Sequence, residues 1–298
     1  MDGYIPYTEK EKKNVYNKGF KTLKESLKVA FHKTDKEAET IVQELKKKQF
    51  TIKEIGKYMK KKYGYENAES LFVTEPTKKG TVGSVNNYIK QRFNEHSYSY
   101  YISLKFVDYM AVEIGFFCII LFCFSYINDT KKDIYELLHT KPIKPASYVF
   151  GKVIGSTSVM IAVIILISFL FNFIVMIHAN KAHLPYEYWD LWRMVGVMLF
   201  PVVFSISAIY LFLSILCKNS LPAVPIILLY IIYSNMGTIG DDGIYGYSIK
   251  PVSLIVRFAD LFLENILSAR VVLNQFCILA FALLCCLLST YLWKRRRV

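Results

Sequence analysis

The chain has 298 residues, of which 53% are hydrophobic, and a formal net charge of +13. Its mean hydropathy of +0.28 excludes an ordinary soluble protein, because the apolar residues are also gathered into long runs. The excess of basic residues would suit nucleic acid or anionic lipid. However, acidic residues alternate with the lysines at helical spacing and no nucleic-acid-binding signature is present. We therefore expect a solvated helical surface and no nucleic-acid partner.

A polar region, residues 1–105, comes first and holds 22 Lys and Arg against 13 Asp and Glu. Two capping-box patterns, Thr-x-x-Glu at 34–37 and at 51–54, each precede apolar residues at helical spacing. They predict helices over 35–48 and 52–63, with lysines in the last turns, where cations suit the helix dipole. This region is expected to form a helical domain outside the membrane.

The end of the polar region contains a turn-forming stretch, 75–80, which includes Pro and Gly and predicts a loop. A further helix is expected over 82–94. Residues 1–25 are polar and lack the apolar segment of a signal peptide, so we expect none there. The six cysteines lie in or at the ends of apolar runs and are interpreted as small apolar residues, with no disulfide framework.

Five apolar runs follow, and most of them reach or approach the ~20 residues that cross ~30 Å of hydrocarbon. They are 107–127, 149–177, 194–216, 221–233 and 271–293. The fourth run is short and carries Pro222 and Pro225, so it is expected to be extended at its ends or to form a broken helix. The sequence thus predicts an all-α, polytopic membrane protein with about five transmembrane helices in residues 106–298.

Two carboxylates, Asp108 and Glu113, lie in the first apolar run. An ionisable side chain inside a bilayer costs about 2.5–3.5 kcal/mol on insertion scales, so it usually faces a bundle interior or a water-filled path. Two interpretations stay open. Together with Arg193 these residues could line or gate a substrate path, or a carboxylate could simply pair with a neighbouring helix, Arg193 being one candidate partner.

The second apolar run begins with small residues four positions apart, Ser147, Gly151 and Gly155. This small-xxx-small pattern predicts close packing against another helix. No motif of a hydrolase, a metalloprotease or a phosphate-binding loop occurs in the chain. His178 and His183 lack a third ligand, so we expect no metal, no cofactor and no catalytic residue in this chain.

The loop between the first two apolar runs, 128–142, has the pattern of a short amphipathic helix. Asp129 or Thr130 can cap it, and the dipeptide Lys141-Pro142 ends it. Its apolar residues share one face at i, i+3, i+4 spacing: Ile134, Leu137 and Leu138. Because a helix this short is unstable alone in water, that face must rest on lipid headgroups or on a partner protein.

This loop and the apolar runs around it resemble the permeases of type-2 ABC exporters. In that family a cytoplasmic helix that often reads Glu-Leu-Leu-x-Thr-x-Pro couples the permease to its ATPase. The matching residues are Glu136, Leu137, Leu138, His139, Thr140, Lys141 and Pro142, followed by Tyr148 and Gly151-Lys152. The resemblance covers residues 105–298 in the layout of their apolar runs. Only the loop motif is specific to the family.

The resemblance implies that a separate nucleotide-binding subunit contacts the loop and hydrolyses ATP with Mg²⁺. The contacting residues would be Ile134, Glu136, Leu137, Leu138 and Thr140. It also implies that a second copy or a sister permease encloses the substrate path. The family usually has six helices, with an extracellular domain between the first two. This chain begins inside that domain, so we expect that the first helix is missing from the sequence.

The short loops predict the orientation, because cytoplasmic loops are richer in Lys and Arg. The side carrying the 128–142 loop and the basic carboxyl terminus is the more basic one. We therefore expect the carboxyl terminus in the cytoplasm and residues 1–105 outside, in the plasma membrane of a bacterium. A different class of function stays open: a membrane-anchored binding, sensing or immunity protein whose outer basic domain recognises a peptide or an anionic polymer.

Overall fold

A computed structural model describes most of the chain. The described residues are 3–72, 77–131, 134, 138, 143–239, 245–247, 249–258 and 262–295. The chain divides into two compact units. The first, here called the amino-terminal unit, comprises Met1–Arg92 and Gly237–Ser248. The second, here called the bundle, comprises Phe93–Met236 and Ile249–Val298.

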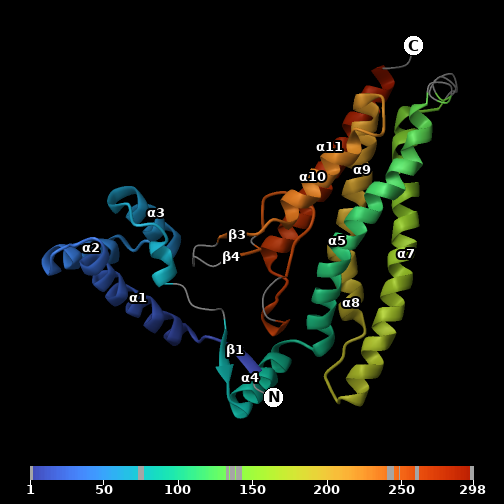
Figure 1. Ribbon diagram of the computed structural model, residues 1–298. Coiled ribbons are helices and arrows are strands. Elements are labelled where there is room, and N and C mark those ends of the chain that lie inside the picture. Colours follow the sequence, from blue (N-terminus) through green and yellow to red (C-terminus); the bar gives the residue numbers. More distant parts are fainter. Residues whose placement is uncertain are drawn as a thin grey trace. The chain divides into compact units, whose positions relative to one another are not determined.

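The amino-terminal unit contains three helices with a small apolar core between them (Figure 1). They are α1 (Glu9–Ala30), α2 (Asp35–Lys48) and α3 (Ile52–Tyr63), followed by the 3-10 turn η1 (Ala68–Leu71). Each helix begins with a complete capping box, in which the Thr hydroxyl and the Glu carboxylate each accept a main-chain N–H. The helices predicted over 35–48 and 52–63 are therefore confirmed.

A two-stranded antiparallel ribbon joins the start of this unit to its later part. β1 (Gly3–Pro6) pairs with β2 (Thr77–Gly80), with Gly3 opposite Gly80, and α4 (Val82–Glu95) follows. The helix predicted over 82–94 is confirmed. The loop predicted over 75–80 is wrong for its last four residues, because β1 supplies their main-chain partners. A second ribbon consists of β3 (Thr238–Ile239) and β4 (Tyr245–Gly246).

The bundle confirms the all-α, polytopic architecture. Its helices are α5 (Tyr98–Ile127), α7 (Pro145–Lys181), α8 (Trp189–Met194), α9 (Phe200–Cys217), α10 (Ala223–Asn235) and α11 (Ala269–Arg295). A short 3-10 turn, η2 (Asn128–Thr130), follows α5, and another, η4 (Phe262–Glu264), precedes α11. In the described part of the chain, four helical stretches are long and apolar enough to cross a membrane, and α8 and α9 form one of them. The fourth predicted run forms α10, whose 13 residues reach only ~20 Å, short of the ~30 Å of hydrocarbon.

The helix α9 lies at the centre of the bundle, in contact with α5, α7, α10 and α11 (Figure 1). In the helical stretch from Trp189 to Cys217, 78% of the most apolar 18 residues are buried, against 28–39% of the corresponding residues in the other three candidate spans. A π-helical turn, η3 (Val195–Leu199), joins α8 to α9. Pro201, the second residue of α9, has no main-chain N–H to donate to the preceding turn. The missing α-helical hydrogen bond accounts for the wider π-helical turn.

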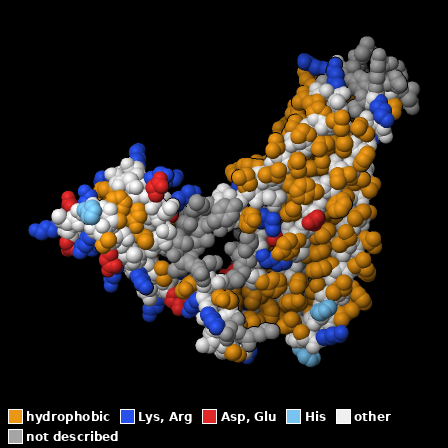
Figure 2. Space-filling view, in the orientation of Figure 1, with side chains coloured by type: hydrophobic (Ala, Val, Ile, Leu, Met, Phe, Trp, Pro, Cys, Tyr) orange, Lys and Arg blue, Asp and Glu red, His pale blue; other side chains and the backbone are white. Residues whose placement is uncertain are grey.

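The outer surface of the bundle is apolar. Figure 2 shows hydrophobic side chains covering most of its visible face, whereas Lys, Arg, Asp and Glu cover much of the amino-terminal unit. Large side chains such as Phe117, Phe124 and Leu166 are more than 60% exposed. Soluble proteins rarely expose apolar surface on this scale, so the bundle is suited to lipid.

Candidate functional site

The predicted partner-binding loop is described at two of its five candidate residues. Ile134 is exposed, whereas Leu138 is partly buried and packs against the apolar core of the bundle. The two therefore differ in environment, although the sequence placed them on one helical face. Glu136, Leu137 and Thr140 lie outside the described residues.

Three polar side chains join the two ends of this loop, and we call Asp129, Tyr148 and Lys152 the loop-root clamp. The Asp129 carboxylate accepts a hydrogen bond from the Tyr148 hydroxyl at 2.8 Å and forms an ion pair with the Lys152 ammonium at 2.8 Å. Lys152 also donates to the carbonyl oxygen of Ser125 at 3.2 Å, near the end of α5. The Tyr148 ring stacks on Trp293 of α11, with 4.0 Å between centroids. The clamp thus fixes the start of α7 to the end of α5.

A set of three buried hydroxyls lies next to the clamp, and we call Tyr126, Ser156 and Ser207 the hydroxyl triangle. The Tyr126 oxygen lies 2.7 Å from Ser156 Oγ and 2.8 Å from Ser207 Oγ, and the two serine oxygens are 2.8 Å apart. All three residues are buried, at 8% exposure or less. They come from α5, α7 and α9, so one polar cluster ties three helices together at the loop end of the bundle.

A buried ion pair occupies the other half of α5. Arg257 Nε donates to the Asp108 carboxylate at 2.7 Å, and the main-chain N–H of Phe258 donates to the same oxygen at 3.0 Å. The Asp108 side chain is 2% exposed and that of Arg257 is 20% exposed. Arg193 was the candidate partner, and this was wrong, because it pairs with Glu187 at 3.0 Å on the surface. The true partner lies 149 residues from Asp108.

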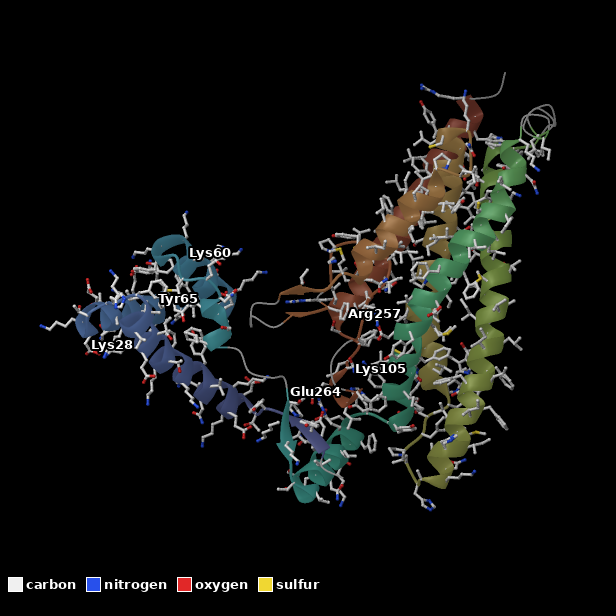
Figure 3. All side chains as sticks on the ribbon, in the orientation of Figure 1. Lys28, Lys60, Tyr65, Lys105, Arg257 and Glu264 are labelled. Atoms are coloured by element: carbon white, nitrogen blue, oxygen red, sulfur yellow. The ribbon has the colours of Figure 1, made fainter. Side chains whose placement is uncertain are left out.

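The partner arginine belongs to a non-helical stretch, residues 251–258, here called the extended segment, which is exposed at its first two residues and mostly buried from Ser253 onward. Ser253 exchanges two hydrogen bonds with the Asn274 side chain of α11, and the N–H of Leu254 donates to Ser234 Oγ of α10. Lys105 of α5 donates to the Phe258 carbonyl, and Figure 3 shows Lys105 and Arg257 close to one another beside α5. Irregular backbone at membrane depth needs such partners, because lipid offers none.

Glu113 lies on the outward face of α5 and is exposed. Within the described residues it makes no hydrogen bond or ion pair, unlike Asp108, five residues earlier. Its exposed neighbours at helical spacing are large and apolar: Tyr109, Phe116, Phe117 and Ile120. An ionised carboxylate on such a face costs about 2.5–3.5 kcal/mol in hydrocarbon. Water, a cation or another polypeptide would therefore cover this face at a lower cost than lipid alone.

The small residues of α7 also face outward. Ser147, Gly151 and Gly155 are exposed, and a Cβ atom added at either glycine would meet no described atom within 4 Å. The predicted close packing is therefore not made within the described part of this chain. The same helix forms one wall of a shallow apolar groove, which Phe200 and Phe204 of α9 close on the other side.

Several of these residues give little signal in the sequence. Ser156, Ser207 and Tyr126 are ordinary members of apolar helices, and only their polar character within long apolar runs could have pointed to an internal network. Lys152 matched the family pattern as part of the Gly151-Lys152 pair, and its ion pair with Asp129 was not predicted. Arg257 lies between two apolar runs, and nothing in the sequence indicates its partner.

The chain was compared with known proteins. No curated protein and no solved structure matches it. A family model described as ABC-2 family transporter protein matches residues 9–291, which includes the amino-terminal unit as well as the bundle. This match extends beyond the layout of residues 105–298 that the loop pattern had indicated. With nearly the whole length matched, the chain belongs to the ABC-2 family of transporter proteins.

Proposed function

We propose that this chain is the membrane-spanning subunit of an ABC transporter, and that a separate nucleotide-binding subunit binds and hydrolyses ATP with Mg²⁺. The family supports transport as the function. The observation that carries the proposal is the root of the 128–142 loop, where the loop-root clamp ties both helix ends to one another. A loop anchored in this way can pass a force from a docked subunit into the bundle.

The contact with the ATPase would be made by Ile134, Glu136, Leu137 and Thr140, and Leu138 would hold the loop on the bundle. Two observations support this assignment. Leu138 packs against the bundle core, which holds the loop in place. Ile134 is exposed, as a residue that a partner covers should be in the isolated chain. The apolar anchor and the free apolar residue are the two features that a docking helix needs.

The bundle would form half of a substrate path, with a second copy or a sister permease forming the other half. The carboxylate of Glu113, which has no partner among the described residues and lies on an exposed apolar face, supports this, because a second bundle or the path itself would relieve its desolvation. The cargo class that suits such a face is a peptide, a lipid-like compound or a drug-like compound, moved outward. Asp108 and Arg257 would shape the outer part of this path, and Arg193 would lie at its rim.

The orientation follows from the distribution of basic residues. The end of the bundle that carries the loop also exposes Lys131, Lys144, Lys218, Lys294 and Arg295. Cytoplasmic ends carry such an excess, so the loop and the carboxyl terminus would be cytoplasmic and the amino-terminal unit would be outside the plasma membrane of a bacterium. The loop would then lie on the side where ATP is available.

The proposal is tested by purifying the chain in mild detergent from its native host and identifying the proteins that come with it. We expect an ATPase subunit, and we expect Glu136→Lys to lose it while the variant still inserts into the membrane. Arg193→Lys, at the far end of the bundle, is the matched control and should retain it. A chain that purifies alone, while other membrane complexes survive, would refute the permease assignment and favour the sensing or immunity protein.

A further inference from the structure

The loop end of the bundle contains a continuous polar network that extends further than an anchor for the loop requires. Displacement of the loop must enter the bundle through two junctions, the end of α5 at Ile127 and the start of α7 at Pro145. The clamp joins these junctions, since Asp129 follows α5 directly and Lys152 lies in the first turns of α7. The two helix ends are therefore constrained to move as one.

The clamp is connected to the hydroxyl triangle. The Lys152 carbonyl accepts from Ser156 Oγ at 2.8 Å, and the Lys152 ammonium lies 5.9 Å from the centroid of the Tyr126 ring. The third member, Ser207, belongs to the central helix α9. Each of the three residues is buried, so an unpaired hydroxyl there would be costly and the triangle strongly favours defined geometries.

The network continues from the triangle to the turn between α9 and α10. The Tyr210 ring lies 5.7 Å from the Tyr126 ring, and the Tyr210 hydroxyl donates to the Ser220 carbonyl at 3.1 Å. Ser214 Oγ and Ser220 Oγ are 3.2 Å apart. A series of hydrogen bonds and ring contacts therefore runs from Asp129 at the loop to Ser220, in the turn before α10.

The triangle can rearrange without leaving its serines unpaired. Ser156 Oγ lies 2.8 Å from the Lys152 carbonyl and 3.2 Å from the Val153 carbonyl, and Ser207 Oγ lies 3.4 Å from the same Val153 carbonyl. If Tyr126 moved away with α5, both serines would keep acceptors on α7. Two discrete arrangements are what a transmitting element needs, because packed cores shift between states rather than deform continuously.

We propose that the loop-root clamp and the hydroxyl triangle transmit displacement of the 128–142 loop to α9 and to the α9–α10 turn. This inference rests on the proposed function, because the displacement would come from the ATPase. It assigns a positioning role to Tyr126, Ser156 and Ser207, which contact neither the ATPase nor the cargo.

The test uses the full chain in complex with its co-purified ATPase, in lipid nanodiscs. Cys217 is exposed at the end of α9 and takes an environment-sensitive thiol-reactive fluorophore, after Cys277→Ser removes the other exposed thiol of the described chain. Mg²⁺ and ATP are then added and the change in fluorescence is recorded. We expect the fluorescence to change in the Cys277→Ser background. In Ser207→Ala the fluorescence change should be at least about five-fold smaller, because five-fold is the low end of typical coupling between two sites.

Ser205→Ala is the matched control. Ser205 lies two residues away on the same helix and is equally buried, but its hydroxyl donates to the Ile278 carbonyl of α11. It should leave the fluorescence change intact. Tyr126→Phe, which removes one hydroxyl and keeps the ring, should reproduce the loss, as should Asp129→Asn, whereas Lys152→Arg should not.

The outcomes separate the two proposals. If no ATPase co-purifies, the proposed function fails and the inference fails with it. If the ATPase is present and Ser207→Ala responds like the background, or if the background itself shows no change, the inference alone is overturned. If the fluorescence change is reduced as much in Ser205→Ala as in Ser207→Ala, the inference is also overturned, because a general loosening of the bundle would then explain both reductions.

Discussion

Removal of Arg257 should cost the bundle far more stability than removal of Arg193, although both arginines form an ion pair with a carboxylate. Arg257→Ala leaves Asp108, whose side chain is 2% exposed, with one remaining hydrogen-bond donor among the described residues, the main-chain N–H of Phe258. Breaking a buried pair from one side typically costs about 3–5 kcal/mol, because a buried charge is left uncompensated. Arg257 is itself 20% exposed, so we expect a value near the lower end, about 3 kcal/mol.

Arg193 is 63% exposed and pairs at 3.0 Å with Glu187, which is 49% exposed. It also lies 3.9 Å from the carboxylate of Asp190, which is 6% exposed but keeps the hydroxyl donors Ser97 and Ser99 when Arg193 is removed. Exposed pairs contribute about 0–1 kcal/mol, so Arg193→Ala should change the free energy of unfolding by less than ~1 kcal/mol. The assay is reversible unfolding of the detergent-solubilised protein by SDS, followed by fluorescence of the tryptophans, all of which lie in the bundle. Equal losses in the two variants would refute the buried ion pair. The double variant Asp108→Leu with Arg257→Met should regain most of the stability, because both charges are then removed together.

Three further predictions concern the amino-terminal unit and the topology. The Lys48 ammonium, together with the hydroxyl of a neighbouring tyrosine, lowers the pKa of Glu44 from 4.5 to about 2. This interaction is fully present above pH 4.5 and is lost as the pH falls towards 2, so the hydrogen-exchange protection factors of α2 and α3, which are corrected for intrinsic rates, should fall over that interval. Glu44→Gln should weaken this dependence, and the capping carboxylates Glu37 and Glu54, whose pKa values are also lowered by their threonine partners, should account for the rest. Gly19→Ala should destabilise this unit by about 1–3 kcal/mol, because the new Cβ would lie 2.8 Å from a main-chain carbonyl oxygen of η1. Gly83→Ala, with no atom within 4 Å, should not destabilise it, and equal thermal shifts would contradict the packing. Finally, a cysteine introduced at Lys47 should react with an impermeant thiol reagent in intact cells; protection until lysis would reverse the proposed orientation.

Local signals in the sequence were sufficient for the elements that local interactions create. The Thr-x-x-Glu patterns located α2 and α3 because a capping box satisfies the free N–H groups of a helix within four residues. The long apolar runs located the spanning helices because membrane thickness sets a minimum length. By contrast, β2 was missed because its partner strand lies more than 70 residues earlier.

The candidate site depended on contacts that no local pattern contains. The sequence singles out both carboxylates of α5, yet nothing in it distinguishes Asp108, which is buried, from Glu113, which is exposed. A helix that is apolar on all sides has no stripe to mark its buried face, unlike the amphipathic helices of a soluble domain. The small residues of α7 raise a similar difficulty, because they indicate that a backbone can approach closely but not which helix approaches.

The hydroxyl triangle shows the same limit for polar residues. Serine and tyrosine are common in apolar helices, where a serine hydroxyl can pair with its own helix and needs no distant partner. Ser214 does this with the Tyr210 carbonyl, whereas Ser207 reaches across to two other helices. Only the arrangement of three helices in space separates these roles.

The central claim is that the 128–142 loop docks an ATPase, and a photoreactive amino acid at position 134 tests it most directly. Ile134 is exposed and Leu138 packs against the bundle core, so the same probe at 138 is the matched control. We predict that irradiation of native membranes crosslinks the chain to an ATP-binding subunit from position 134 and much less from position 138. Crosslinks from position 134 to lipid alone, in a chain that is inserted and folded, would contradict the account.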